Sequence, residues 1–137
     1  MILADTGFFI ALINRRDRHH ARAKVCLEQL REPLLTTWPV ATETCHLLAR
    51  TSPDLALQFL RSLHAGAARL HDLSEAHVPR IIALTEHYRD LPMDLADASL
   101  VIAAEDLGHG RIFSTDERDF RAYRWKSKKP FTNLMLP

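Results

Sequence analysis

Short apolar runs alternate along this chain with longer segments whose apolar residues recur at helical spacing. The short runs predict strands, and they cover residues 1–6, 33–37, 68–73, 111–115 and 131–136. The longer segments predict helices over residues 8–14, 17–30, 39–50, 53–64, 74–89 and 94–107. Strands that alternate with helices are typical of a parallel sheet covered on both faces. We therefore predict an α/β fold, a three-layer α/β/α sandwich with a central, mainly parallel sheet of four to five strands.

Capping residues mark several of the predicted helix ends. Ser52-Pro53 is a favourable helix start, because serine caps free N–H groups and proline suits the first turn, and Gly66 suits the end of that helix. Pro79 conflicts with a helix that begins at Ser74, so we expect this helix to begin later or to kink. The apolar pattern predicts that its inward-facing residues are Val78, Ile81, Ile82 and Thr85.

The length and composition fit one globular domain that spans residues 1–137. The chain is 47% apolar and 26% charged, with a formal net charge of +1, so its global charge indicates no partner. Its two cysteines, Cys26 and Cys45, form neither a disulfide framework nor a zinc-binding spacing, and we expect both to be buried as small hydrophobic residues. No segment is long and apolar enough to span a membrane, so we expect a cytoplasmic protein without a membrane partner.

The segment 93–104 combines an apolar helix with two carboxylates at its start. Asp94 and Asp97 are three residues apart and therefore lie close to one face, which otherwise has the apolar character of a core. An ionised carboxylate against a core is costly unless a positive group faces it. The candidates are the positive end of the helix dipole, a distant arginine, or a metal ion. A capping box in which both acids bind free N–H groups explains the pair equally well.

Further acids are expected at the same edge of the sheet. Asp5 ends the first predicted strand and Asp116 follows the fourth, while Glu43 and Asp97 lie near the N-terminal ends of helices. Four acids without a paired base repel one another unless cations bind, and hard oxygen ligands favour Mg²⁺ or Mn²⁺. Two such ions support phosphodiester hydrolysis by activating water and stabilising the leaving oxygen. Asp119 fits a helix cap better than a metal ligand.

Four short motifs give the chain a resemblance to a known family. They are Leu3-Ala4-Asp5-Thr6, Trp38-Pro39-Val40-Ala41-Thr42-Glu43, Met93-Asp94-Leu95-Ala96-Asp97-Ala98, and Ile112-Phe113-Ser114-Thr115-Asp116 with Arg118-Asp119-Phe120 behind it. In this order, across nearly the whole chain, they resemble the PIN domain family and, within it, the VapC-type toxins of bacterial toxin–antitoxin pairs. Each motif is short and unspecific, whereas the ordered set is fairly specific.

The resemblance implies a ribonuclease that depends on one or two Mg²⁺ or Mn²⁺ ions. By this match Asp5, Glu43, Asp97 and Asp116 carry over as the catalytic, metal-binding acids, and Asp94 is an additional acid that binds the second metal or caps its helix. Thr6 and Ser114 match polar positions beside the metals. The family also implies an RNA substrate, a small antitoxin protein as partner, and a homodimer.

The charge distribution adds candidate RNA contacts. Residues 111–130 contain seven Lys or Arg against three acids, whereas residues 86–106 contain six acids against one Arg. An acidic centre beside basic segments suits a metal-dependent site that acts on a polyanion. The candidates for contact with the RNA backbone are Arg118, Arg121, Arg124 and Lys126. Trp125 can stack on a base, or it can anchor the C-terminal segment in the core together with Tyr123.

Three other classes of protein are less consistent with the sequence than a nuclease. A receiver domain requires adjacent acids after the first strand, but Asp5 stands alone and Asp72 is a poor acceptor. A haloacid-dehalogenase-type phosphatase requires a second Asp two residues after the first, where this chain has Gly7. A non-catalytic PIN-like module that binds RNA or a partner remains as the alternative, and the intact set of four acids disfavours it.

Overall fold

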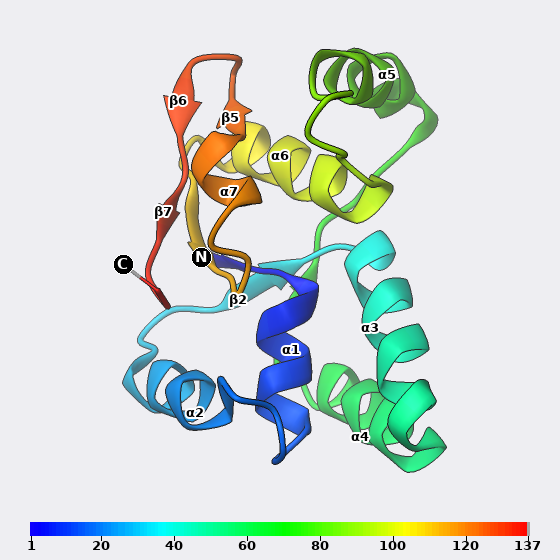
Figure 1. The fold of residues 1–137 in the computed structure, drawn as a ribbon, viewed down its shortest axis with the longest axis vertical. Coiled ribbons are helices and arrows are strands. Elements are labelled where there is room, and N and C mark those ends of the chain that lie inside the picture. Colours follow the sequence, from blue (N-terminus) through cyan, green and yellow to red (C-terminus); the bar gives the residue numbers. More distant parts are fainter. Residues whose placement is uncertain (137) are drawn as a thin grey trace.

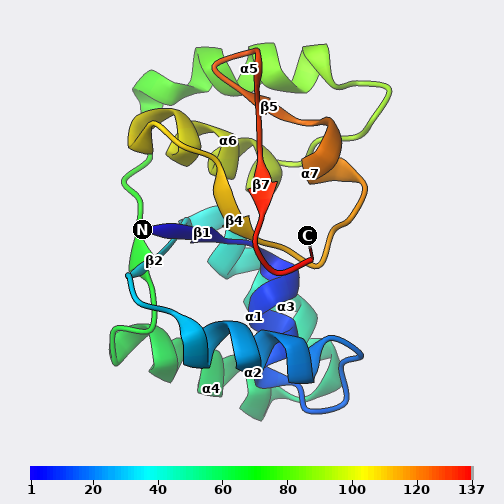
Figure 2. The same cartoon turned by 90° about the vertical axis from the view of Figure 1, so that its left-hand side faces the viewer.

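The computed structural model describes residues 1–136 and shows one five-stranded sheet between two helical layers (Figures 1 and 2). The strands are β1 (Ile2–Ala4), β2 (Leu34–Thr36), β3 (Arg69–Leu70), β4 (Arg111–Phe113) and β7 (Thr132–Asn133). Their order is β3-β2-β1-β4-β7, and all four neighbouring pairs are parallel. In the central strand Leu3 pairs with Leu35 on one side and with Ile112 on the other. The predicted three-layer fold is therefore confirmed.

Four helices cover one face of the sheet, and the remaining elements cover the other (Figure 2). The first layer contains α1 (Thr6–Ile13), α2 (His20–Gln29), α3 (Trp38–Thr51) and α4 (Pro53–His64). The second contains a 3₁₀ turn η1 (Glu75–His77), α5 (Val78–His87), α6 (Leu95–Leu107), α7 (Asp119–Ala122) and the hairpin of β5 (Arg124–Trp125) with β6 (Lys129–Pro130). Because the five strands of the central sheet run in the same direction, the carboxyl ends of β1 and β4 lie at one edge of that sheet.

The central strand and α6 form the middle of the hydrophobic core. All three residues of β1 are buried, as expected for a strand covered on both faces. In α6 every residue from Ala98 to Ala104 is buried, which confirms the prediction of a well-buried helix. Gly108 ends this helix in the left-handed region, at φ 81°, where glycine has no steric penalty.

Helix α5 differs in two ways from the sequence prediction. It begins at Val78, after the 3₁₀ turn, so Pro79 lies in the first turn, where its missing N–H costs nothing. The predicted inward face is wrong at three of its four residues: Val78 and Ile82 are 46% and 53% exposed, and Thr85 is exposed. Ile81 is half-buried against the core, and Leu84 is the buried residue. The reason is that α5 lies on the outer side of α6, so only one side of α5 faces the core and the rest faces solvent.

The C-terminal segment contains a helix and a hairpin that the apolar pattern did not predict. The hairpin turns through Lys126 and Ser127, which have φ of 48° and 63° although neither is the glycine or asparagine that usually marks such a turn. Trp125 is buried, and its Nε1 donates a hydrogen bond to the Pro130 carbonyl at 3.0 Å. Tyr123 is also buried, so both residues anchor this segment, and Trp125 offers no free face for a base.

The cysteines and helix lengths add two observations. Cys26 is buried and Cys45 is half-buried, and both are free thiols. Burial raises the thiol pKa at both positions, which lowers the reactivity of the two thiols.

Across residues 1–136, no helix has the length and apolar character that crossing a membrane requires.

Candidate active site

A cleft lined by carboxylates lies where β1 and β4 end and where α3 and α6 begin. Its volume is about 330 Å³, and its walls include Asp5, Glu43, Asp94, Asp97, Asp116 and Asp119. Among the described residues that line it, none is a lysine, arginine or histidine. The structure therefore brings together all five predicted metal-binding acids and adds a sixth, Asp119.

Asp5 is the most buried of these acids. It caps α1, where its Oδ1 accepts a hydrogen bond from the Phe8 N–H at 3.0 Å. The Ser114 hydroxyl donates to its other oxygen, so both oxygens are held. Burial raises the pKa of Asp5 to about 6 despite these two bonds, and the charges of Asp116 and Glu43 add to the increase. A cation in the cleft would favour the ionised form.

Asp94 and Asp97 form the capping box at the start of α6. Oδ1 of Asp94 accepts from the Asp97 N–H at 2.8 Å, and Oδ2 of Asp97 accepts from the Asp94 N–H at 3.4 Å. The capping interpretation is thus confirmed, yet both side chains also line the cleft. Burial, followed by the charge of Asp94, raises the pKa of Asp97 to about 8, while the Tyr123 hydroxyl opposes this increase.

Glu43 on α3 and Thr6 on α1 are neighbours in the lining of the cleft. Burial raises the pKa of Glu43, and the Asp94 carboxyl raises it further. The Thr6 hydroxyl lies close enough to Glu43 to lower this pKa, but it makes no hydrogen bond of normal geometry within residues 1–136. Thr6 is only 8% exposed, so a buried hydroxyl oxygen remains without a partner beside the acids. Such a group indicates an additional ligand or water.

Asp116 organises the loop after β4. Its Oδ1 accepts from the N–H groups of Arg118 at 3.0 Å and of Asp119 at 2.8 Å, and its own N–H donates to the Ser114 hydroxyl at 2.9 Å. The expectation that Asp119 is the cap was therefore wrong, because Asp116 supplies the capping oxygen. The carboxyl of Asp119 instead lines the cleft, where burial and the charge of Asp116 raise its pKa.

Four residues that sequence reasoning missed support or line the cleft. Asn133 on β7 binds both backbone groups of Ser114: its Oδ1 accepts from the Ser114 N–H at 3.3 Å, and its Nδ2 donates to the Ser114 carbonyl at 2.9 Å. The Tyr123 hydroxyl donates a hydrogen bond to Oδ2 of Asp97. Thr115 and Gly7 lie in the wall, and a Cβ at Gly7 would stand 1.8 Å from the Thr115 hydroxyl. Nothing in the local sequence marks these contacts, because each joins distant parts of the chain.

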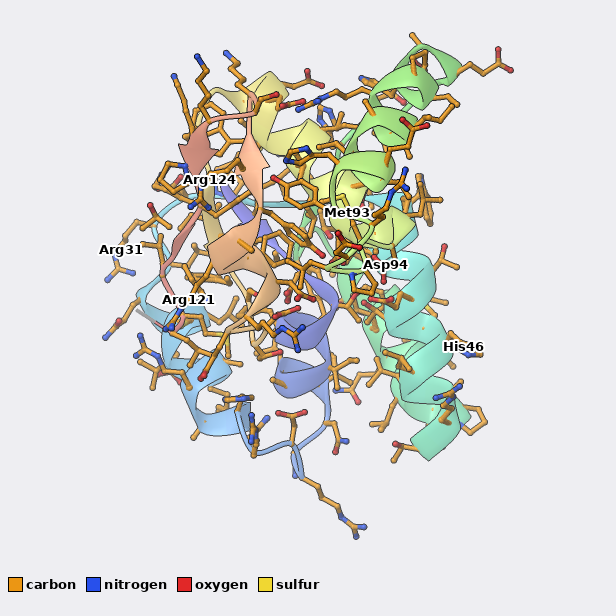
Figure 3. The ribbon with its side chains drawn as sticks, turned by 45° about the horizontal axis from the view of Figure 1, so that its top comes forward. Arg31, His46, Met93, Asp94, Arg121 and Arg124 are labelled. Atoms are coloured by element: carbon orange, nitrogen blue, oxygen red, sulfur yellow. The ribbon has the colours of Figure 1, made fainter. Side chains whose placement is uncertain are left out.

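The four predicted RNA-contacting residues do not share one environment. Arg118, Arg121 and Lys126 are exposed. Arg124 is half-buried, and its Nη1 donates to the carbonyls of Arg121, Ala122 and Tyr123 at 2.8, 3.2 and 2.9 Å, so it caps the end of α7. Figure 3 places Arg121 and Arg124 on one side of the view, whereas Asp94 and His46 lie on the other.

The fold and the cleft define a class of α/β proteins with clustered carboxylates at the carboxyl edge of a parallel sheet. The PIN domain family model matches residues 2–126, so the chain belongs to the PIN domain family. Ribonuclease VapC26 from Mycobacterium tuberculosis is 27% identical over 124 residues, which are 90% of this chain and 92% of that protein. The resemblance noted in the sequence is therefore confirmed.

A solved structure shows the same architecture. It is VapC20 from Mycobacterium tuberculosis, whose description is a sarcin-ricin loop cleaving toxin. It superposes with a TM-score of 0.83 and 21% sequence identity, and the match covers 95% of this chain and 100% of VapC20. At this identity the likeness establishes the shared fold.

Proposed function

We propose that this chain is a single-domain ribonuclease that depends on Mg²⁺ or Mn²⁺ and hydrolyses RNA phosphodiester bonds. The observation that carries the proposal is the cleft of six carboxylates, whose lining within residues 1–136 contains no basic side chain. Membership of the PIN family and the likeness to Ribonuclease VapC26 support the nuclease assignment. We further propose that it is the toxin of a type II toxin–antitoxin pair, which acts in the cytoplasm, forms a homodimer and binds a small antitoxin protein.

The donor set of the cleft fits a divalent ion that keeps part of its water shell. Burial and the neighbouring acids raise the pKa of Asp5 and Asp97, and within residues 1–136 the buried Thr6 hydroxyl has no hydrogen-bond partner. In residues 1–136, no three carboxylate, histidine or cysteine side chains are arranged to hold one ion by themselves. Mg²⁺ commonly uses one or two carboxylates together with waters and substrate phosphates, so an all-protein cage is not required.

The chain's own residues would prepare the hydrolysis as follows. Ser114 and the Phe8 N–H fix the Asp5 carboxylate, while Tyr123 and the Asp94 N–H hold Asp97. A bound divalent ion would supply Lewis-acid stabilisation of the phosphate and a lower pKa for water. Glu43, whose pKa is raised by burial, is suited to accept a proton from the attacking water. Water adds to phosphorus, and the P–O bond to the leaving ribose oxygen breaks.

The basic residues beyond β4 would position the RNA strand. Arg118, Arg121 and Lys126 are exposed and free to contact phosphates without reading sequence. We retain Arg124 as a candidate through its remaining N–H groups, although its Nη1 is engaged by backbone carbonyls. The RNA thus approaches the cleft from the side of α7.

Cleavage of a mixed pool of structured RNA tests the proposal. Purified protein is assayed with Mg²⁺, with Mn²⁺ and with EDTA, beside Asp5→Asn and the control Asp90→Asn, which changes an exposed acid outside the cleft. We expect cuts that require the metal, disappear in Asp5→Asn and persist in Asp90→Asn.

The same assay separates the nuclease from the non-catalytic alternative. Folded protein, free of any co-purified inhibitor, that leaves every RNA intact would reject the nuclease and favour a binding module. Equal cleavage by Asp5→Asn and the wild type would show that the active site lies elsewhere.

A further inference from the structure

A second hollow lies between α5 and the β5–β6 hairpin, which occupy the same end of the molecule (Figures 1 and 2). Its volume is about 240 Å³, and we call it the basic pocket. Five of its lining side chains can donate hydrogen bonds, namely Arg80, His87, Tyr88, Arg124 and Ser127. Among residues 1–136, no aspartate or glutamate belongs to its lining. The basic pocket therefore has the opposite charge character to the acidic cleft.

One carboxylate outside the basic pocket connects its two walls. Glu105 on α6 accepts hydrogen bonds from Nε and Nη2 of Arg80 at 3.0 and 2.8 Å. Its Oε2 also accepts from the Lys126 N–H at 2.5 Å. Arg80 belongs to α5 and Lys126 follows β5, so both walls are held in place without a ligand. A preformed pocket of this kind loses little conformational freedom when it binds.

Both arginines keep N–H groups that these contacts do not use. Arg80 binds Glu105 through Nε and Nη2, which leaves Nη1, and Glu105 compensates its charge. Arg124 binds backbone carbonyls through Nη1 alone, and within residues 1–136 no carboxylate forms an ion pair with it. The charge of Arg124 is therefore uncompensated.

The rest of the basic pocket also favours an anion. The Tyr88 hydroxyl accepts from the Arg124 N–H at 2.9 Å, so its own proton remains to be donated. On the hairpin, Lys126, Lys128 and Lys129 are exposed and add positive charge to this end of the molecule. An anion with several acceptor oxygens would satisfy such a set of donors.

Two tyrosine rings separate the basic pocket from the acidic cleft. The Tyr123 hydroxyl donates to Asp97 in the cleft at 3.2 Å. Its ring packs edge-on against Tyr88, with the ring centroids 5.0 Å apart, and Tyr88 lines the basic pocket. A strand whose reacting phosphate lies in the cleft can therefore place another of its phosphates in the basic pocket.

We propose that the basic pocket binds one phosphate group of the RNA strand, at a position separate from the bond that is cut. This inference rests on the proposed ribonuclease function and adds a second anchoring point to it. Arginine binds phosphate oxygens through paired N–H groups, and phosphate contacts position a strand without reading its sequence. A strand held at both places has a fixed register, so the separation of the pocket and the cleft selects the bond that is cut.

A carboxylate introduced into the basic pocket tests the proposal. Ala83 lines the pocket and is exposed on α5, so Ala83→Glu places a negative charge beside the arginines and keeps a good helix former. Ala83→Gln is the matched control of similar size without the charge. Leu57→Glu introduces the same charge at an exposed residue of α4, outside the cleft and the pocket. Circular dichroism verifies that all three variants fold.

Inorganic phosphate is the first probe, because its binding requires no activity. In EDTA and at constant ionic strength, NMR follows the Nε–H signals of Arg80 and Arg124 and the amide of Ser127 as phosphate is added. We expect saturable shifts in the wild type, Ala83→Gln and Leu57→Glu. The Kd for phosphate should be at least about tenfold higher in Ala83→Glu, because the new carboxylate repels the anion.

A single-stranded oligonucleotide that contains the cleavage site is the second probe. Its phosphodiesters are replaced one at a time by uncharged methylphosphonates, and fluorescence anisotropy in EDTA measures the Kd while the strand stays intact. At one position other than the cut, the replacement should raise the Kd about tenfold in the wild type and in Ala83→Gln. The same replacement should change Ala83→Glu less than about twofold, because that contact is already lost. The slope of log K against log salt concentration should also be lower by about 0.7 in Ala83→Glu.

Two results would overturn the inference while leaving the ribonuclease in place. One is metal-dependent cleavage by proteins in which Ala83→Glu and Ala83→Gln respond alike to every methylphosphonate. The other is saturable binding of inorganic phosphate without any methylphosphonate position that depends on residue 83, which would assign the pocket to a small phosphate compound. The expected methylphosphonate response in a folded protein that cleaves no RNA would support the pocket and reject the proposed function. Absence of phosphate binding, strand binding and cleavage would reject both.

Discussion

The Tyr123 hydroxyl lies 3.2 Å from Oδ2 of Asp97, although the two residues are 26 positions apart in sequence. The same hydroxyl is 3.2 Å from the Pro92 carbonyl, so its single proton is shared between two acceptors. The phenol ring is fully buried and packs edge-on against Tyr88 and Phe120. A core residue therefore sets the position of a carboxylate that faces the cleft.

Tyr123→Phe should weaken metal binding while it preserves the core. It removes the donor to Asp97 but keeps the ring, and hydrogen bonds to charged groups contribute about 1.5–3 kcal/mol. We expect the Kd for Mn²⁺, measured by calorimetry, to rise about tenfold or more. Tyr88→Phe is the matched control, because its hydroxyl accepts a hydrogen bond from the Arg124 N–H and does not contact Asp97. Unchanged Mn²⁺ affinity in Tyr123→Phe would show that the contact does not support the site.

The metal-free protein should lose stability as the pH rises from about 4 to about 8. The pKa of Asp5 is about 6 and that of Asp97 about 8 in the folded chain, both above the ordinary value of 3.8. The folded state therefore binds more protons than the unfolded state in this range, so its free energy of unfolding decreases as protons leave. Urea unfolding in EDTA at pH 5 and pH 8 measures this difference.

Asp97→Asn isolates one part of that pH dependence. Its free energy of unfolding should fall less than that of the wild type between pH 5 and pH 8, and it should be the more stable protein at pH 8. The control Asp90→Asn should follow the wild type. If the free energy of unfolding changed equally with pH in Asp97→Asn and in the wild type, a raised pKa at Asp97 would be contradicted. Added Mn²⁺ should stabilise the wild type more at pH 8 than at pH 5, because metal binding displaces protons.

Asn133→Ala should destabilise the protein by about 1–3 kcal/mol, because it leaves the N–H and carbonyl of Ser114 without partners. Since Ser114 donates to Asp5, we also expect slower metal-dependent cleavage. Thermal and urea unfolding measure the stability, and Thr132→Ala, an exposed neighbour on the same strand, is the control. A variant as stable as the wild type would show that β7 adds little to the site.

Arg121→Ala should lower RNA affinity for all sequences alike. A lost phosphate contact reduces the slope of log K against log salt concentration by about one, whereas a lost base contact changes sequence preference. Fluorescence anisotropy at several salt concentrations distinguishes the two. Arg124→Ala should instead lower the melting temperature, since its guanidinium caps α7. An unchanged salt slope in Arg121→Ala would remove this residue from the RNA path.

The sequence predicted those parts of the fold that depend on local chemistry. Asp94 could be identified as a cap from its spacing to Asp97 alone, and the run at the first strand was apolar enough to predict burial on both faces. The places of Asp5 and Asp116 after strands, and of Glu43 and Asp97 near helix starts, predicted that distant acids meet at one edge. These features can be predicted from the near neighbours of each residue in sequence and from the direction of the strands.

Other features were not predictable, because they depend on contacts between distant residues. The turn at Lys126 and Ser127 has no glycine to mark it, so its hairpin was missed. The apolar residues Val78 and Ile82 suggested a buried face, but α5 packs on the outer side of α6 and leaves them exposed. Trp38 could not be separated from a core tryptophan in sequence, whereas Trp125 is the buried one of the pair.

The pairing of the first strand has a consequence for synthesis of the chain on the ribosome. Strand β1 leaves the ribosome first, but its partner β4 lies at 111–113, and the Ser114 hydroxyl that binds Asp5 is 109 residues further along the chain. Parallel pairing over such a separation forms late. A nascent chain therefore has no assembled carboxylate cluster until residues 111–116 have left the ribosome, so the ribosome that synthesises the chain does not meet a completed cleft before that point.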